Sequence, residues 1–140
     1  MKITDVYLAS FKEGAKVPAY SGVAAGFPSP ADDFLEDKLD LNEKLIKHPA
    51  ATFFVRVSGN SMVKAGINSG DLLIVDRSLE PRTGNIIVAI LNGDFTVKRI
   101  SKRGQRLFLV PENSNYNPIE ITDDSNFQVW GVVTNVIRNV

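Results

Sequence analysis

The sequence predicts a mainly β fold: a partly closed antiparallel β-barrel or sandwich with a flexible N-terminal arm and one or two short helices. Three observations predict it. Strand-like segments follow one another from residue 51 to residue 137 without helical patterns between them. Asn92-Gly93, between two of these segments, is a strong hairpin turn. Residues 1–30 hold three glycines and three prolines among small residues, which disfavours regular structure.

Composition narrows the class of protein. The chain has 140 residues, enough for one domain that buries its own core. It carries 16 basic and 16 acidic residues and no basic run, which argues against direct sequence-specific DNA binding. The absence of cysteine excludes thiol nucleophiles and cysteine-based zinc sites. Neither a signal peptide nor an apolar run of membrane-spanning length is evident, so we expect a cytoplasmic protein with no membrane contact.

We expect the chain to divide near residue 30, into a flexible N-terminal arm over residues 1–30 and a β domain over residues 31–140. Within the arm, residues 3–8 could form a short strand. Ser29-Pro30, followed by two aspartates, predicts the start of a helix, because serine caps, proline fits the first turn and acids favour the positive end of the helix dipole.

A second helix start is predicted at Asp40, which has Glu43 three residues later as in a capping box. His48-Pro49 should end this helix, since the residue before proline avoids helical geometry. The buried side of the helix is expected to consist of Leu41, Leu45 and Ile46.

Strands are predicted in the remainder of the chain from β-branched and aromatic runs between turn residues. The predicted ranges are 52–57, 71–76, 85–91, 94–100, 106–110, 119–121 and 127–137. The most basic stretch, residues 99–106, is expected to be a solvated hairpin tip rather than a phosphate site. Residues 66–71 lack the lysine ending of a phosphate loop, so we interpret them as a turn.

The first candidate for chemistry is Ser61, within Ser58-Gly59-Asn60-Ser61-Met62. Gly59 permits a tight turn, and a serine just after such a turn can have backbone N–H groups aimed at an oxyanion. Taken alone, the stretch is more often a polar turn. The competing serine, Ser58, lies nearer the strand and is better placed to bond the turn backbone.

The second candidate is Lys98, inside the predicted strand 94–100. Thr96, Lys98 and Ile100 share one face of that strand, whereas Arg99 points the other way. Such a lysine is usually solvated. In a partly apolar pocket, however, burial would keep its amine neutral, and it could take the proton of Ser61. The pair suggests a Ser–Lys peptide-bond hydrolase, with the small residues Ala24-Ala25-Gly26 as a substrate in the same chain.

Histidine chemistry is disfavoured. His48 is the only histidine, and its place at a helix end favours a capping or surface role over a Ser–His–Asp triad. No partner residues at metal-ligand spacing accompany it. No cofactor and no metal are therefore expected.

Together these residues resemble the LexA-type self-cleaving Ser/Lys peptidases, the S24 family, over about residues 23–138. The matching pieces are Gly26-Phe27-Pro28-Ser29-Pro30-Ala31, Leu41-Asn42, His48-Pro49, Ser58–Met62, Gly70–Asp76, Phe95-Thr96-Val97-Lys98, Pro111, Asn113-Ser114, Tyr116 and Pro118-Ile119.

The resemblance implies a barrel like that of LexA and the signal peptidases, with Ser61 as nucleophile and Lys98 as general base. It implies that Ala25–Gly26 is the bond cut, and we expect the backbone N–H groups of Ser61 and Met62 to hold the oxyanion. Polymerase-associated members commonly carry cysteine before that glycine, whereas this chain has Ala25, as LexA-type cleavage sites do.

Partners are implied in the same way. Within the family, the chain resembles the accessory subunits of SOS-induced translesion polymerases. This resemblance implies a homodimer, a UmuC-like Y-family DNA polymerase as partner, and a RecA filament on single-stranded DNA as co-protease. The alternatives are a LexA-like repressor fragment, which would need a helix-turn-helix ahead of the peptidase part, and a catalytically silent β-rich interaction module. A general protease has the least support, since nothing suggests a broad substrate cleft.

Overall fold

The computed structural model describes residues 1–9, 16–17 and 39–140. The chain divides into two units, one formed by Met1–Ala9 with His48–Val140 and the other by Ser10–Lys47. The first unit contains the strand-rich sheet that positions the candidate site.

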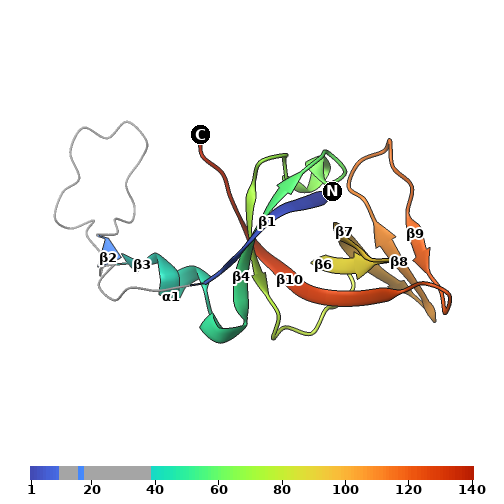
Figure 1. Ribbon diagram of the computed structural model, residues 1–140, viewed down its shortest axis with the longest axis horizontal. Coiled ribbons are helices and arrows are strands. Elements are labelled where there is room, and N and C mark those ends of the chain that lie inside the picture. The colour runs from blue at the N-terminus through green and yellow to red at the C-terminus, as the bar shows by residue number, and fades with distance from the viewer. Residues whose placement is uncertain (10–15, 18–38) are drawn as a thin grey trace. The chain divides into compact units, whose positions relative to one another are not determined.

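That sheet has eight strands, all paired antiparallel, in the order β1-β4-β5-β10-β6-β7-β8-β9 (Figure 1). It curves into a half-barrel, so the predicted fold class is confirmed. The long strand β10 lies between β5 and β6 and joins the two halves of the sheet. The strands are β1 (Lys2–Leu8), β4 (Thr52–Ser58), β5 (Leu72–Asp76), β6 (Ile86–Leu91), β7 (Asp94–Arg103), β8 (Arg106–Val110), β9 (Ile119–Ile121) and β10 (Phe127–Ile137).

The seven strands predicted downstream of residue 51 are all present. The β6–β7 hairpin turns at Asn92 and Gly93, whose φ angles of 50° and 88° are those that favour asparagine and glycine. The basic stretch forms the β7–β8 hairpin, as predicted, and its Arg106 pairs with Glu120 on β9.

The short strand predicted over residues 3–8 is present as β1, which pairs antiparallel with β4 from Lys2 opposite Ser58 to Leu8 opposite Phe53. It forms one edge of the eight-stranded sheet. The domain boundary predicted at residue 30 lies outside the described residues.

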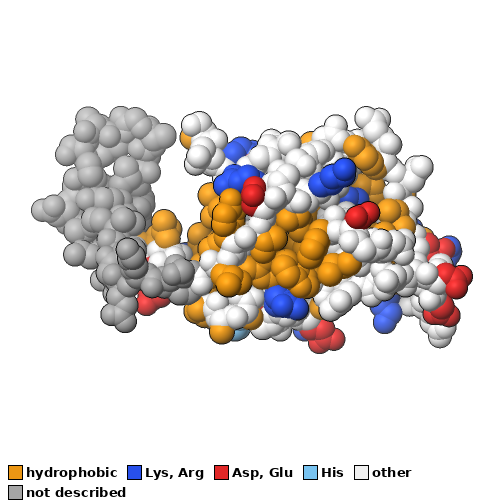
Figure 2. Space-filling model, viewed as in Figure 1, with side chains coloured by type: hydrophobic (Ala, Val, Ile, Leu, Met, Phe, Trp, Pro, Cys, Tyr) orange, Lys and Arg blue, Asp and Glu red, His pale blue; other side chains and the backbone are white. Residues whose placement is uncertain are grey.

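The core forms where alternate side chains of the curved strands turn inward. On β4, Phe53, Val55 and Val57 are buried and contribute to one cluster; a second cluster gathers around Ile87, Ile100 and Leu109. Hydrophobic side chains also reach the surface on the face shown in Figure 2. Exposed apolar residues of the sheet include Val6, Phe95 and Val136.

The unit of residues 10–47 holds a two-stranded ladder of β2 (Lys16–Val17) and β3 (Leu39–Asp40), followed by α1 (Leu41–Leu45). Asp40 caps α1, and its carboxylate accepts a hydrogen bond from the Asn42 N–H at 2.9 Å, so the helix start predicted there is confirmed. The helix start predicted at Ser29-Pro30 lies outside the described residues.

The predicted buried side of this helix is wrong, because no residue of α1 is buried. Leu41 is 52% exposed and Leu45 is half-buried, and of the three predicted residues only Ile46, at the C-cap, is buried. The reason is length: a helix of five residues makes little more than one turn and has no continuous face to bury. Among the described residues, no helix is both long and apolar enough to cross a membrane.

Candidate active site

Ser61 lies in a turn directly after β4. Gly59 has a φ of 98°, a left-handed conformation that permits the chain to reverse there. Ser61 is only 1% exposed, and the next side chain, Met62, lies fully buried in the first core cluster. A short 3-10 helix, η3 (Val63–Ala65), follows. The serine is therefore held at the inner surface of the sheet by the packing of its neighbour.

The loop after β8 fixes the backbone of this turn. The Glu112 N–H donates to the Ser61 carbonyl oxygen at 2.8 Å. The Asn113 amide donates to the Asn60 carbonyl at 2.8 Å, and the Tyr116 hydroxyl donates to the Asn60 side-chain oxygen at 2.6 Å. These contacts hold both sides of the peptide that carries Ser61.

Lys98 projects from β7 toward the same turn and is only 7% exposed. Its Nζ lies 3.1 Å from Ser61 Oγ, 2.9 Å from Thr96 Oγ1 and 3.1 Å from the Val97 carbonyl oxygen. Burial lowers the pKa of Lys98 from its ordinary value of 10.5, because the charged amine loses its hydration. The structure thus brings Ser61 and Lys98 together in a site that favours a neutral amine.

A second nitrogen reaches the same hydroxyl. The α-amino group of Met1 donates to Ser61 Oγ at 2.8 Å. Burial, a hydrogen bond with Lys98 and the charge of Lys98 lower the pKa of this amine from 8.0 to about 5. Two amines with lowered pKa values therefore flank one serine.

The backbone N–H groups of Ser61 and Met62 donate to no acceptor among the residues that the structure describes. The following N–H groups are used: Val63 donates to Asn60, and Ala65 donates to Met62. Two donors beside the hydroxyl thus remain available to a developing negative charge.

Ser58, the competing serine, lies within β4 opposite Lys2. The Gly59 N–H donates to Ser69 Oγ at 3.2 Å, so another serine takes the turn-bonding role expected of Ser58. Ala25 and Gly26, the residues of the predicted cleavage site, lie outside the described residues.

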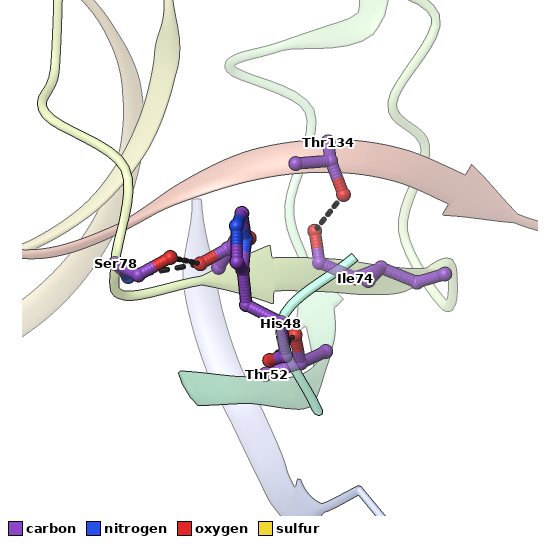
Figure 3. A network of polar contacts seen from close by, with 6 residues as sticks. His48, Thr52, Ile74, Ser78 and Thr134 are labelled. Carbon is purple, nitrogen blue, oxygen red and sulfur yellow. Dashed lines mark hydrogen bonds and ion pairs between the residues drawn. The ribbon is translucent and has the colours of Figure 1, made fainter. Parts of the chain in front are cut away.

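His48 takes a structural role. Its Nδ1 lies 2.6 Å from Asp76 Oδ2, and the other Asp76 oxygen accepts from the backbone N–H and the hydroxyl of Ser78 (Figure 3). Burial opposes ionisation of Asp76, but the hydrogen bonds from Ser78 and His48 outweigh it and lower the pKa of the carboxyl. Within the described part of the chain, no three histidine, cysteine or acidic side chains gather as a metal site.

Two participants were missed by the sequence reasoning. Thr96 lies two residues before Lys98, so the two side chains share one strand face, and this spacing is the sequence signal for its contact with Nζ. Met1 carried no signal at all, because its place beside Ser61 depends on the pairing of β1 with a strand fifty residues away.

A serine hydroxyl beside a buried lysine amine is the arrangement expected of a serine hydrolase that uses lysine in place of histidine. The chain matches the family model described as Peptidase S24-like over residues 18–134. It therefore belongs to the S24 family, whose peptidases are self-cleaving serine peptidases, and the family resemblance of the sequence is confirmed.

The chain is also similar to curated proteins along most of its length. The chain is 47% identical to Protein SamA of Salmonella typhimurium over 114 residues, which cover 81% of this chain and 79% of that protein. It is 47% identical to Protein ImpA of Escherichia coli (81% and 77% covered) and 45% identical to Protein MucA of Escherichia coli (84% and 82% covered). These relatives are UmuD-like SOS mutagenesis proteins, and the likeness is consistent with a UmuD-like function.

Proposed function

We propose that this chain is a UmuD-like serine peptidase that cuts its own Ala25–Gly26 bond with a Ser61–Lys98 dyad. The shortened chain, which begins at Gly26, is the active accessory subunit of an error-prone translesion DNA polymerase. The observation that carries the proposal is the distance of 3.1 Å between the buried Lys98 Nζ and Ser61 Oγ.

The surroundings of Nζ support Lys98 as the base. Nζ is buried, and its hydrogen-bond partners are the uncharged oxygens of Ser61, Thr96 and Val97. These three oxygens can accept all three N–H groups of an ammonium, so hydrogen-bond counting does not select the protonation state. Burial selects it: no carboxylate of the described residues pairs with Nζ, and loss of hydration lowers the pKa of the amine. The lone pair of the neutral amine can then take the proton of Ser61.

The chemistry then follows in two stages. Lys98 takes the Ser61 proton as Oγ attacks the Ala25 carbonyl carbon, and the resulting oxyanion is held by the N–H groups of Ser61 and Met62. The Lys98 ammonium gives its proton to the Gly26 nitrogen as the peptide bond breaks, which leaves Ala25 esterified to Ser61. Water, deprotonated by Lys98, attacks the ester, and the proton returns to Ser61.

The partners follow from the family likeness. A RecA filament on single-stranded DNA would promote cleavage by raising the population in which residues 24–26 lie across Ser61, a population shift rather than new chemistry. A homodimer and a UmuC-like Y-family polymerase complete the assembly. The edges of a curved sheet are suited to such pairing.

The test compares intact masses before and after incubation with activated RecA filament or at alkaline pH. The wild-type chain and a Lys102→Ala control, which alters an exposed lysine on the same strand, should both lose residues 1–25. Ser61→Ala and Lys98→Ala should stay whole. Full-rate processing of Lys98→Ala would reject the dyad. Loss of processing in Lys102→Ala, with Lys98→Ala still processed, would reject it as well.

A further inference from the structure

The strand β1 brings a free α-amino group to the candidate nucleophile. Ser61 Oγ lies 2.8 Å from the Met1 nitrogen and 3.1 Å from Lys98 Nζ. The proposed dyad uses only the second of these nitrogens, so the first needs its own explanation.

The position of Met1 is built into the sheet. Six residue pairs tie β1 to β4, and Met1 and Ile3 pack against the first core cluster. The chain also passes close to the nucleophile turn: a Cβ atom added at Gly59 would lie 3.6 Å from the Met1 Cα. The amine is thus delivered to Ser61 by a paired strand.

The position of the Met1 nitrogen matches that of the amine which a serine peptidase releases. When a serine peptidase cuts a peptide bond, the departing group is an amine that lies beside the serine oxygen and takes its proton from the general acid. Here the departing Gly26 nitrogen would become a primary α-amino group next to Ser61 and Lys98. The Met1 nitrogen is the same chemical group, and it hydrogen-bonds to Oγ of the same serine.

We infer that the site beside Ser61 and Lys98 binds a free α-amino terminus, and that in this chain β1 fills it as a product mimic that competes with the peptide to be cut. The competition rests on the proposed function, whereas the amine site does not. Cleavage then requires β1 to withdraw from β4, at least at its Met1 end.

The surroundings of Met1 fit this competition. Met1, Lys2 and Ile3 face the start of β7 across a cavity of about 460 Å³, whose other walls are formed by residues 93–96. Thr96, one of the lining residues, also holds Lys98. Withdrawal of β1 would remove the walls that Met1, Lys2 and Ile3 contribute to this cavity, and would leave the side of Thr96, the hydrogen-bond partner of Lys98, open to an incoming peptide.

The first arm of the test measures occupancy. Trace acetylation of the Met1 amine, followed by mass across a pH range, reports its titration in the whole chain, after intact mass has confirmed that Met1 is retained. We expect a pKa of about 5 in the wild-type chain, against an ordinary value of 8.0. A titration near 8 in the folded wild-type chain would overturn the inference.

The second arm measures competition with Val6→Pro. Val6 pairs with Val55 in mid-strand, and proline there removes a backbone donor and weakens pairing at this edge. Ala9→Pro, one residue beyond β1, is the matched control. Val6→Pro should return the Met1 amine to a titration near 8 and self-cleave several-fold faster at a fixed pH, whereas Ala9→Pro should match wild type in both.

The two arms separate the inference from the proposed function. Cleavage of folded Val6→Pro no faster than that of Ala9→Pro would overturn the competition. If no variant is cleaved under any condition, the proposed function fails, while a wild-type titration near 5 still supports the amine site. Thermal unfolding of each variant shows that the comparison is made between folded chains.

Discussion

At the scale of single residues, the central feature is the burial of Lys98, which removes its amine from water. Lys98 is buried beside one hydroxyl from Ser61, one from Thr96 and one backbone carbonyl. No carboxylate of the described residues hydrogen-bonds or pairs with its Nζ. Burial without a counter-charge destabilises the ammonium and lowers the pKa of Lys98, so the neutral amine that acts as base is present at a lower pH than in an exposed lysine.

The first prediction concerns pH. Because the pKa of Lys98 is lowered from 10.5, the neutral fraction grows as pH rises, and the self-cleavage rate should rise with pH and level off below 10.5. Rates measured by mass between about pH 6 and pH 10 test this. Lys98→Arg should be inactive throughout, because a guanidinium does not lose its proton in this range. A flat wild-type profile would contradict the assignment of Lys98.

The second prediction concerns Thr96, proposed as a positioning residue for Lys98. Thr96→Val removes one acceptor of the amine at nearly constant shape, and loss of a hydrogen bond of about 1 kcal/mol corresponds to a rate lower by roughly fivefold. Thr96→Ser keeps the hydroxyl and should retain most of the rate. The pH profile of Thr96→Val should also shift. An unchanged rate and profile in Thr96→Val would remove Thr96 from the site.

At the scale of elements, the site depends on how three segments meet. β4 delivers the Ser61 turn, β7 delivers Lys98, and the loop after β8 clamps Asn60 and Ser61 from the side. β4 and β7 are not neighbours in the sheet, since β5, β10 and β6 lie between them. Curvature of the sheet brings their residues together, so the twist and bulges of β10 matter for chemistry.

The third prediction concerns Gly131, at an irregularity in the pairing of β10 with β6. A Cβ atom there would lie 2.6 Å from Val75 Cγ1 and 3.3 Å from the Asp76 carbonyl oxygen. Gly131→Ala should therefore lower the free energy of unfolding by about 1–3 kcal/mol through overpacking. Gln128→Ala, at an exposed site of the same strand, should change it by less than about 0.5 kcal/mol.

Denaturant unfolding of both variants provides the measurement. If Gly131→Ala and Gln128→Ala unfold at the same denaturant concentration, the prediction that a side chain at residue 131 overpacks against β5 is wrong. A large loss in Gly131→Ala alone supports the glycine as the residue that lets the two strands curve together.

At the scale of the whole molecule, the proposed self-cleavage would remove residues 1–25 from a chain whose core lies mainly downstream. Residues 1–25 contribute β1, an edge strand, whereas the other seven strands of the large sheet lie downstream of residue 51. Most of the buried core belongs to those seven strands.

The fourth prediction is that the fragment of residues 26–140 stays folded. It should unfold cooperatively, but at a lower temperature than the intact Ser61→Ala chain, because the packing of Met1 and Ile3 against the core is lost. Circular dichroism during heating tests this. A fragment without a cooperative transition at room temperature or above would show that β1 is required for the fold.

Much of this molecule could be predicted from local sequence. The strands follow from β-branched and aromatic runs, and the β6–β7 hairpin from Asn92-Gly93, because these signals act over a few residues. A serine after a glycine turn and a lysine within a strand make Ser61 and Lys98 candidates, and the resemblance to the S24 family implies their roles. The burial of Leu41 was predicted wrongly, because a helical pattern does not reveal how short the helix is.

The remainder of the site depends on non-local pairing. No local signal joins Met1 to Ser61 or Tyr116 to Asn60, since each contact spans more than fifty residues and depends on the curvature of the whole sheet. Strand register and closure are set by the assembled core rather than by any one segment.

The central claim is that Lys98 activates Ser61 against the bond between Ala25 and Gly26. The most direct measurement is the mass and N-terminal residue of the larger product after alkaline incubation of the whole chain, beside Lys98→Ala treated in the same way. We expect a single product that begins at Gly26 in the wild-type chain and an intact Lys98→Ala chain. A product that begins elsewhere, or equal shortening of both chains, would contradict it.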